Sequence, residues 1–327
     1  MEQSLYPLKF MPLFKDKIWG GNKIKEIVGI DYSPLENCGE LWALSSVEGD
    51  ETIVENGFLA ECTLREVIDM YTDELLGEKS YYEFGEHFPL LFKIIDAKEK
   101  LSVQVHPDNS MAQQKGMENG KTEMWYIMQA DQGAEIISGF NKNMTKAELI
   151  NRLRDKNLAQ ALNIEETEKG DLFFIPSGRI HAIGAGVLLA EIQQSSDATY
   201  RVYDWDRTDQ KGDYRTLHVK EALEALDFSS VGTAKSAYDF ELNKTSELIT
   251  NPYFTTNILH LTEALKKDYT FLDNFVVYLC VESSAVIHSM GHQISIRSGE
   301  AVLIPAIAEN TIIEPNGFVT ILETYII

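Results

Sequence analysis

The sequence predicts a mainly β protein made of two related β-barrels, with a few helices. Short apolar runs broken by glycine and proline recur along the chain, which is typical of all-β folds. A stretch of glycine, acid, four apolar residues and proline occurs twice, at residues 170–176 and 299–305, and this repeat indicates two related barrels. We expect residues 1–235 to form one domain, with N-terminal strands and short helices, and residues 236–327 to form the other.

Composition limits the function. Hydrophobic residues make up 44% of the chain, enough for a large core, and no window reaches the roughly 20 apolar residues that span a bilayer. The start of the chain lacks a signal-peptide pattern, and its three cysteines lie far apart, so we expect a cytoplasmic protein with no membrane partner. A net charge of −22 argues against nucleic-acid binding, and an anionic substrate would need a local cluster of cations.

The N-terminal quarter predicts short strands and one helix. Residues 1–60 hold apolar runs interrupted by glycine and proline, which favour strands and loops. Residues 39–45 (GELWALS) favour a strand edge with a core tryptophan, although a place for the carboxylate and indole in a site stays open. Residues 63–77 begin with a Thr-x-x-Glu capping box and end at Gly77, so they predict a helix.

Two strands follow. Residues 88–96 are a continuous apolar run with Lys93 inside it. A buried ammonium costs on the order of several kcal/mol unless it is paired, so Lys93 either extends to the surface or lines a polar cavity. The next stretch, LSVQVHP, alternates apolar and polar residues, and a strand there places Ser102, Gln104 and His106 on one face.

The remaining pattern alternates between strands and short helices. Residues 123–128 predict a strand with alternate side chains, Glu123 among them, on one face. The further expectations are two short helices over 145–162, strands from 172 and over 187–194, a helix over 217–226, and a β-rich tail from 254 to the end.

The turn in the first repeat predicts a metal ligand. Residues 170–181 have the pattern G-x5-P-x-G-x2-H, which resembles the second motif of the cupin (jelly-roll) barrels: proline and glycine make a turn, and His181 begins a return strand pointing inward. The pieces that correspond to the first cupin motif are Gln104, His106 and Glu123, so the resemblance implies a set of one amide oxygen, two imidazoles and one carboxylate. Zn²⁺ accepts such nitrogen and oxygen ligands, and Fe²⁺ or Mn²⁺ remain open on ligand chemistry alone.

The second repeat lacks this ligand. Asn310 stands where the histidine would fall, and we detect no second polar strand face in that part of the chain. We therefore expect the metal and the chemistry in the first domain alone, and a degenerate second domain without metal.

Several motifs carry a family resemblance. The G-x5-P-x-G-x2-H pattern resembles the second motif of cupin barrels, and the stretches QVHP, GKTEMWY, HAIGAG, EIQQSSD and YRVYDW closely resemble the type I mannose-6-phosphate isomerase (phosphomannose isomerase) family. Only 57 residues separate Glu123 from His181, too few for the helical domain of larger members, so the chain is similar to the compact bacterial form. The resemblance implies interconversion of mannose 6-phosphate and fructose 6-phosphate, and one Zn²⁺ per chain bound by Gln104, His106, Glu123 and His181.

The resemblance also implies catalytic residues. Lys121 and Arg201 belong to the active site, and Glu191 and Asp197 to its acidic side. Lys121 lies two residues before a ligand, so a strand points both into one cavity, where a divalent cation would lower the lysine pKa and make it a proton carrier. Arg201 suits an enediolate or phosphate oxygen, and Asp197 is the candidate for ring opening. The base that removes the C2 proton stays undetermined.

Two further residues are candidates for substrate binding. Ser102 shares the polar strand face and could hydrogen-bond the phosphate together with Lys93. The open alternatives are that Lys93 is structural and that Arg201 and Asp197 simply pair with each other. We expect Lys93, Lys121, Arg201 and the metal to form a local positive pocket.

Three function classes can be weighed. A zinc-dependent sugar-phosphate isomerase needs Lys121 and Arg201 beside the metal, whereas a non-catalytic sugar-binding cupin needs neither. An iron cupin dioxygenase is a poor match to a glutamine ligand. We therefore expect an isomerase whose partner is a small sugar phosphate, and the oligomeric state stays open.

Overall fold

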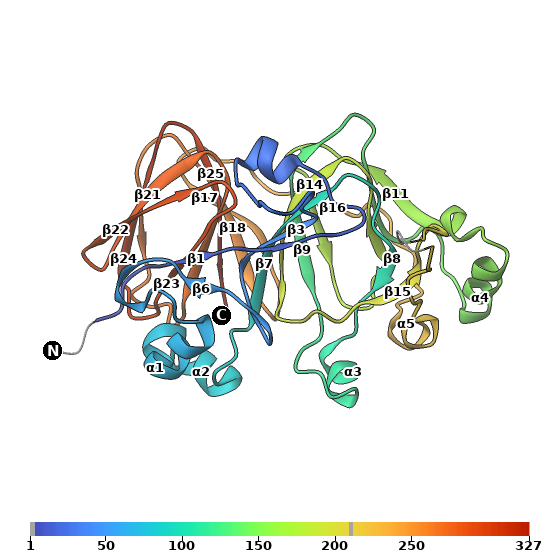
Figure 1. Ribbon diagram of the computed structural model, residues 1–327, viewed down its shortest axis with the longest axis horizontal. Helices are drawn as coiled ribbons and strands as arrows, with labels where there is room; N and C mark the ends of the chain where they lie inside the picture. The colour runs from blue at the N-terminus through green and yellow to red at the C-terminus, as the bar shows by residue number, and fades with distance from the viewer. Residues whose placement is uncertain (1–3, 209–211, 327) are drawn as a thin grey trace.

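The computed structural model describes residues 4–208 and 212–326, and it consists of two β-barrels that lie side by side (Figure 1). The chain is mainly β with a few short helices and two cupin-like barrels, so the predicted fold class is confirmed. Nowhere in the described ranges is there a helix of the length and apolar character that crossing a membrane demands.

The first barrel is built from two antiparallel sheets. One sheet has seven strands in the order β16-β12-β9-β14-β7-β3-β2, and the other has five in the order β11-β10-β13-β8-β15. In sheet order, the bounds are Lys235–Ser236, Leu172–Ile175, Glu123–Ala130, Val187–Gln194, Leu90–Ala97, Glu40–Leu44 and Leu13–Lys15, then Leu162–Glu166, Glu135–Phe140, His181–Ile183, Val103–Val105 and Tyr200–Tyr203.

The second barrel repeats this plan. Its sheets have the orders β17-β18-β25-β20-β23-β1-β6 and β19-β24-β21-β22, and a separate ribbon joins β4 to β5. In the same order, the bounds are Thr245–Thr250, Thr255–Leu261, Val319–Tyr325, Val276–Glu282, Ala301–Ile304, Leu8–Met11 and Ile53–Val54, then Leu265–Asp268, Asn310–Pro315, Ser284–Ser289 and His292–Arg297, with Ser46–Val47 and Asp50–Glu51 in the ribbon.

The N-terminal segment contributes to both barrels. Strand β3 extends the first barrel by pairing with β7, and β2 in turn pairs with β3, whereas β1 extends the second barrel by pairing with β23. The rings of Phe88 and Phe275, which precede a central strand of each barrel, pack with centroids 4.6 Å apart, and both side chains are fully buried. The barrels therefore share a core, and the domain boundary after residue 235 stays a prediction.

Helices occupy the outside of the barrels (Figure 1). The predicted helix is α1 (Leu64–Leu76), and its capping box and the end at Gly77 are present. Over 145–162 the structure has α4 (Lys146–Arg154) and one 3-10 turn, and β11 then begins at Leu162, where alternate side chains suit pairing with β10 better than a second helix. The other helical segments are α2 (Glu78–Phe84), α3 (Asn109–Gln114), α5 (Val219–Ala225), a π-turn at Ile24–Val28 and a 3-10 turn at Gly57–Leu59.

The sequence repeat has a structural counterpart. The two glycines that open the copies have positive φ angles, 93° at Gly170 and 85° at Gly299, which a side chain would disfavour. Strand β12 follows the first and β23 the second, and the return strands begin at His181 and at Asn310. The histidine is buried, whereas the asparagine is exposed. The first barrel alone thus directs an imidazole inward at this position.

Candidate metal centre and active-site pocket

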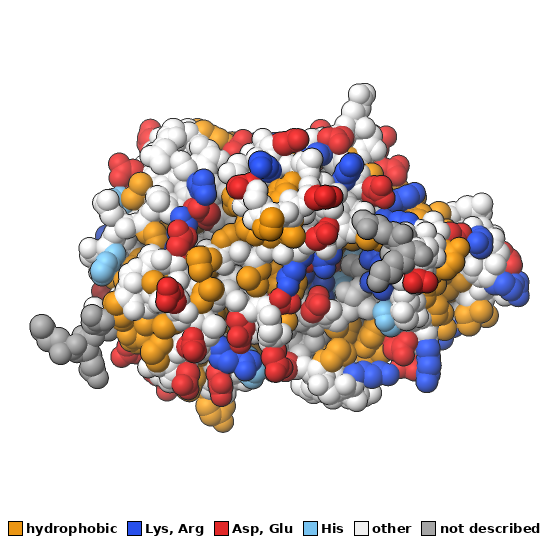
Figure 2. Space-filling model, viewed as in Figure 1, with side chains coloured by type: hydrophobic (Ala, Val, Ile, Leu, Met, Phe, Trp, Pro, Cys, Tyr) orange, Lys and Arg blue, Asp and Glu red, His pale blue; other side chains and the backbone are white. Residues whose placement is uncertain are grey.

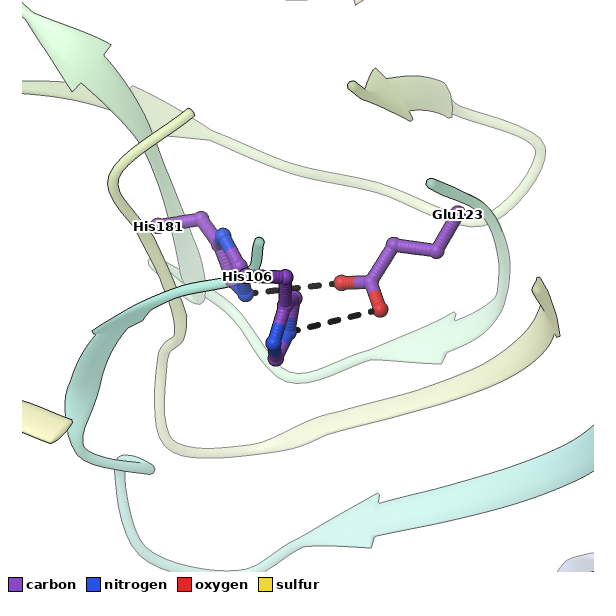
Figure 3. A group of neighbouring side chains, drawn as sticks. All are labelled: His106, Glu123 and His181. Atoms are coloured by element: carbon purple, nitrogen blue, oxygen red, sulfur yellow. Dashed lines mark ion pairs between the residues drawn. The ribbon is translucent and has the colours of Figure 1, made fainter. Parts of the chain in front are cut away.

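Three side chains from different strands of the first barrel converge in its interior (Figure 3). His106 follows β8, Glu123 begins β9 and His181 begins β13. The His106 Nε2 atom lies 3.6 Å from Glu123 Oε2, and His181 Nε2 lies 3.4 Å from Glu123 Oε1. All three residues are at most 1% exposed. One atom from each could bind a common metal ion, since these atoms lie within 4.8 Å of one another.

Local backbone structure sets this convergence. His181 lies directly opposite Gln104 in the pairing of β13 with β8. The turn before β13 contains Gly178, whose φ is 82° and whose N–H donates to the carbonyl of His106 at 2.9 Å. The predicted proline–glycine turn thus connects the two histidine-bearing segments directly.

Hydrogen bonds fix the orientation of both imidazoles. Nδ1 of His106 lies 2.7 Å from the carbonyl of Ala198, and Nδ1 of His181 lies 2.8 Å from the carbonyl of Arg179. Because a carbonyl only accepts, each ring carries its proton on Nδ1 and turns a lone pair on Nε2 toward Glu123. Metal-binding histidines commonly show this arrangement.

The electrostatics of the group favour a cation. Burial lowers the pKa of both histidines, that of His181 to about 4, so both rings are neutral. Each dashed contact in Figure 3 therefore brings two acceptor atoms together. Within the described residues, His106 Nε2 and both Glu123 oxygens accept no hydrogen bond, and the nearest cation is Lys121 Nζ, 3.3 Å from Glu123 Oε2. Buried acceptors without donors fit a bound metal.

Gln104 lies beside the group. Its Nε2 atom is 3.3 Å from His181 Nε2, and Ser102 Oγ donates to its Oε1 at 3.4 Å. A half-turn of the carboxamide would direct the oxygen toward His181, which is the orientation that a metal ligand needs. The ligand role of Gln104 stays a prediction.

A cavity of about 300 Å³ opens next to this group of side chains. Figure 2 shows Lys and Arg side chains gathered at a hollow in the face over the first barrel. The cavity contains every predicted catalytic and substrate-binding residue, together with Gln104, and no predicted residue of these classes lies elsewhere. Its charged lining residues are Lys17, Lys93, Lys121, Arg201 and Arg215, with Glu40, Glu191 and Asp197. The local cluster of cations that an anionic substrate requires is present in this acidic protein.

Lys93 lines the cavity instead of extending to the surface. It is 3% exposed, and its Nζ lies 3.2 Å from Glu191 Oε1 and donates to Gln193 Oε1 at 2.9 Å. The same atom lies 4.9 Å from the ring centroid of Trp42. Of the two alternatives for Lys93, a side chain that extends to the surface or one that lines a polar cavity, the structure therefore shows the second.

Mutual interactions set the charge states of the acids and of Lys121. Burial alone would raise the pKa of Glu191, but Lys93 and Lys121 outweigh it and lower that pKa. For Glu123, burial and the charge of Glu191 together raise the pKa. Burial alone would lower the pKa of Lys121, but the surrounding carboxylates reverse the shift. The protein groups alone thus keep Lys121 charged, opposite in direction to the effect of a divalent cation.

Arg201 and Asp197 both line the cavity but form no ion pair with each other in the part of the chain that the structure describes. The Arg201 side chain donates to the carbonyl of Thr216 at 2.9 Å, and its backbone lies opposite Gln104 in the pairing of β15 with β8. Ser102 is buried in the same wall. Arg201 is thereby directed into the cavity from the strand next to the proposed ligands.

Sequence reasoning missed three charged lining residues. Glu40 is joined to Lys17 by a 3.3 Å ion pair, and it accepts a 2.8 Å hydrogen bond from the indole of Trp42. The GELW stretch carried a signal for Glu40, because a carboxylate two residues from an indole shares its strand face. Trp42 is a core residue as expected, but the neighbouring carboxylate lines the cavity. Lys17 and Arg215 lie in irregular segments where no pattern marked them.

Comparisons with known proteins agree on one family. A family model of the type I phosphomannose isomerase catalytic domain matches residues 7–122. The chain is 36% identical to a mannose-6-phosphate isomerase of Streptococcus mutans over 91% of this chain and 92% of the relative, and 35% identical to one of Bacillus subtilis over 91% and 93%. The crystal structure of a mannose 6-phosphate isomerase from Bacillus subtilis superposes with a TM-score of 0.87 at 31% identity, covering 98% of this chain and 99% of that one.

Proposed function

The chain belongs to the mannose-6-phosphate isomerase family, and we propose that it interconverts mannose 6-phosphate and fructose 6-phosphate in the cavity of the first barrel. The observation that carries this proposal is the cavity itself. Five cationic side chains surround it in a protein of net charge −22, directly beside the buried His–Glu–His group. An anionic sugar would be repelled elsewhere on such a protein and attracted here.

We propose that one Zn²⁺ per chain is held by Gln104, His106, Glu123 and His181. Two neutral imidazoles, a carboxylate and an amide oxygen match the nitrogen and oxygen ligands that this ion prefers. The unpartnered acceptors of the group support a metal at this place. When bound, the ion supplies Lewis-acid stabilisation of charge on substrate oxygens.

Lys121 and Glu191 are proposed as proton carriers. The reaction moves one proton from C2 to C1 of the open-chain sugar and one from the C2 hydroxyl to the C1 oxygen, through a cis-enediol. Glu191 is kept ionised by two lysines, which suits a group that accepts a proton. The Lys121 ammonium, 3.3 Å from Glu123 Oε2, is placed at the boundary between ligands and cavity, where it can donate one.

Arg201 and Asp197 are proposed to act at different stages of the reaction, the enediolate stage and ring opening. The guanidinium of Arg201 remains charged throughout and presents a planar donor fork, so it suits the negative charge that develops on an enediolate oxygen. Asp197 lines the same cavity and carries the proposed role in opening the sugar ring, which requires proton transfer between the anomeric hydroxyl and the ring oxygen.

Ser102 and Lys93 are the proposed contacts of the phosphate group. Both are buried in the cavity wall, and Lys93 contributes a positive charge while Ser102 contributes a hydroxyl donor. A cytoplasmic location completes the proposal, supported by the three cysteines, which are all free thiols.

The decisive experiment is an assay of the purified protein on mannose 6-phosphate with a coupled readout of fructose 6-phosphate. Activity should disappear after chelation and return when zinc is added. Absence of turnover in the zinc-restored protein would refute the isomerase. A sugar-binding cupin without catalysis would bind the substrate but give no product, so calorimetric binding in the same sample separates the two functions.

A further inference from the structure

Arg215 enters the cavity from an irregular segment, and a buried carboxylate holds it there. Its Nε donates to Asp204 Oδ2 at 2.7 Å, and a terminal nitrogen donates to Asp204 Oδ1 at 2.5 Å. This two-bond contact fixes the plane of the guanidinium as well as its position. We propose that Asp204 is a positioning residue that holds Arg215 against the cavity for the anionic end of the substrate, an inference that rests on the proposed function.

Asp204 is itself firmly held. It is 5% exposed, and Arg207 donates to its Oδ1 at 2.5 Å. Arg207 also donates to the carbonyl of Lys100 at 2.6 Å, which ties the cluster to the segment before β8. Burial alone would raise the Asp204 pKa, but the hydrogen bonds from both arginines outweigh it and lower that pKa. The carboxylate is therefore ionised and has little freedom to turn away.

The backbone after Asp204 is bent in a way that few sequences adopt. Trp205 and Asp206 have consecutive positive φ angles of 59° and 54°, a conformation that disfavours residues with side chains. The Trp205 indole N–H donates to the carbonyl of Leu101 at 2.7 Å, and Lys100 Nζ lies 3.9 Å from the centroid of its ring. These contacts maintain the bend. The Tyr-Asp-Trp end of the YRVYDW motif, which the proposed chemistry does not use, thus acquires a function.

The charge balance of the cluster favours an anion in the cavity. Arg201 and Arg215 both line it, and after burial the charge of Arg215 is the largest influence that lowers the pKa of Arg201. Arg207 and Arg215 share one carboxylate, that of Asp204, so these three side chains together keep a net positive charge. Arg215 adds a guanidinium to the cavity wall that holds Ser102 and Lys93, and a phosphate dianion can be bound by such a group through two oxygens.

If Asp204 had only a structural role, the loss of Asp204 and the loss of Arg207 would weaken ligand binding equally. Arg207 therefore supplies the matched control. It pairs with the same oxygen of Asp204 as Arg215 does, but it lies outside the described lining of the cavity. We would measure, by calorimetry on the zinc-loaded protein, the Kd of a hexitol 6-phosphate, which lacks the carbonyl and cannot isomerise. The variants are Asp204→Asn, Arg215→Gln, their double variant and Arg207→Gln.

Positioning predicts that Asp204→Asn and Arg215→Gln each raise the Kd about tenfold, that the double variant binds as Arg215→Gln does, and that Arg207→Gln, which removes only one of the supports of Asp204, raises it by no more than about threefold. Equal weakening by all three single variants, additive losses in the double variant, or an unchanged Kd in Asp204→Asn would each overturn the inference.

Should Asp204→Asn fail to fold, Arg215→Lys provides the test, because it keeps the charge and loses the two-bond contact; wild-type affinity in it would equally overturn the inference. The ligand does not react, so these outcomes do not depend on turnover. A wild-type protein that binds the hexitol phosphate yet fails to isomerise mannose 6-phosphate would refute the proposed function and leave this inference standing.

Discussion

Strands β14 and β25 occupy the same place in the two barrels. β14 pairs with β9 on one side and β7 on the other, as β25 pairs with β20 and β18. The strand registers place Glu191 of β14 and Glu323 of β25 at equivalent positions, each in an interior strand of its sheet. The residues directly opposite are Trp125 and Lys93 for the first, and Tyr278 and Asn257 for the second.

The second barrel lacks counterparts of Glu123 and His181. Glu123 lies opposite the last residue of β12, and the corresponding residue opposite the end of β23 is Val276. Asn310 takes the place of His181 at the start of the return strand. These two differences remove a carboxylate and an imidazole from the second barrel and leave the surrounding strand pairing intact.

Glu323, the counterpart of Glu191 in the second barrel, belongs to a closed hydrogen-bond network. Glu323 is fully buried and accepts from Asn257 Nδ2 at 2.8 Å, from Lys267 Nζ at 2.9 Å and from the hydroxyl of Tyr269. In the first barrel, by contrast, the oxygens of Glu123 accept no hydrogen bond from any described residue. The same framework thus supports a satisfied polar core in one barrel and a set of acceptors available to a ligand in the other.

The largest expected effect follows from removing a ligand in one barrel and its counterpart in the other. His181→Ala should reduce bound zinc to a small fraction and turnover by ~10³-fold or more, because several kcal/mol of transition-state stabilisation depend on the metal. Gln104→Ala should also lower the zinc content. Asn310→Ala should leave both quantities unchanged. Metal analysis and the coupled assay check all three, and full zinc occupancy in both first-barrel variants would refute the site.

The sequence predicted this asymmetry only in part. The spacing of Gly170 to His181, and its copy ending at Asn310, revealed the gain or loss of one ligand because the repeat is local. The expectation that the second barrel has no strand face like that of Ser102, Gln104 and His106 stays a prediction, and the sequence did not reveal that Glu323 occupies the place of Glu191. That equivalence depends on pairing between distant strands, and a one-residue change of register would abolish it.

The lining of the cavity was also predicted only in part. Every predicted catalytic and substrate-binding residue lies in its wall. Alternation along the strand indicated the face that carries Ser102, whereas the family resemblance supplied Lys121, Glu191, Asp197 and Arg201. Arg215 escaped prediction because an ion pair with Asp204, and no periodic pattern, directs it inward. Lys17 likewise depends on Glu40, a contact across separate segments.

The next comparison is between two lysines that each lie beside a buried glutamate, Lys121 in the first barrel and Lys267 in the second. Lys121→Met should lower turnover by ~10²-fold or more while zinc stays bound, because it removes a proton carrier and leaves the ligands intact. Lys267→Met in the second barrel should leave turnover per folded molecule unchanged and lower the melting temperature, because Glu323 loses a cationic partner. Assay, metal content and thermal denaturation of both variants distinguish these roles; unchanged turnover in Lys121→Met would remove it from the mechanism.

The equivalent glutamates should respond in opposite ways. Glu323→Gln should cost about 2–4 kcal/mol of unfolding free energy, because an amide donor then faces the donors of Asn257 and Lys267. Glu191→Gln should lower turnover by ~10²-fold with a smaller loss of stability. Denaturant unfolding and the coupled assay check the pair. A stability loss in Glu191→Gln as large as in Glu323→Gln would show that both glutamates are structural.

The smallest effect concerns stability against pH, and the barrels again offer equivalent positions. Asp96 of β7 lies opposite Leu188, and His260 of β18 lies opposite Thr320, in the same registers that relate the two glutamates. Both side chains are buried, and each has one atom, Asp96 Oδ1 and His260 Nε2, without a hydrogen bond from the described residues.

Burial raises the pKa of Asp96 to about 6 and lowers that of His260, so the two groups act in opposite directions. The folded state holds the Asp96 proton up to about pH 6, whereas the unfolded state releases it near the ordinary aspartate pKa of 3.8, so Asp96 reduces stability as pH rises through this window. Asp96→Asn should then exceed the wild type by up to ~2 kcal/mol at pH 7.5, with the difference vanishing near pH 4.

His260 is neutral when buried, so the stability that depends on it is present above the unfolded pKa of 6.5 and is lost as pH falls. His260→Gln should therefore flatten the acid side of the stability profile while Asp96→Asn removes the fall in stability toward neutrality. Urea unfolding of both variants between pH 4 and pH 8 measures the two slopes. Parallel profiles for wild type and variants would mean that neither buried group titrates differently in the folded protein, and the contrast between the barrels would then be confined to the metal ligands and the glutamates.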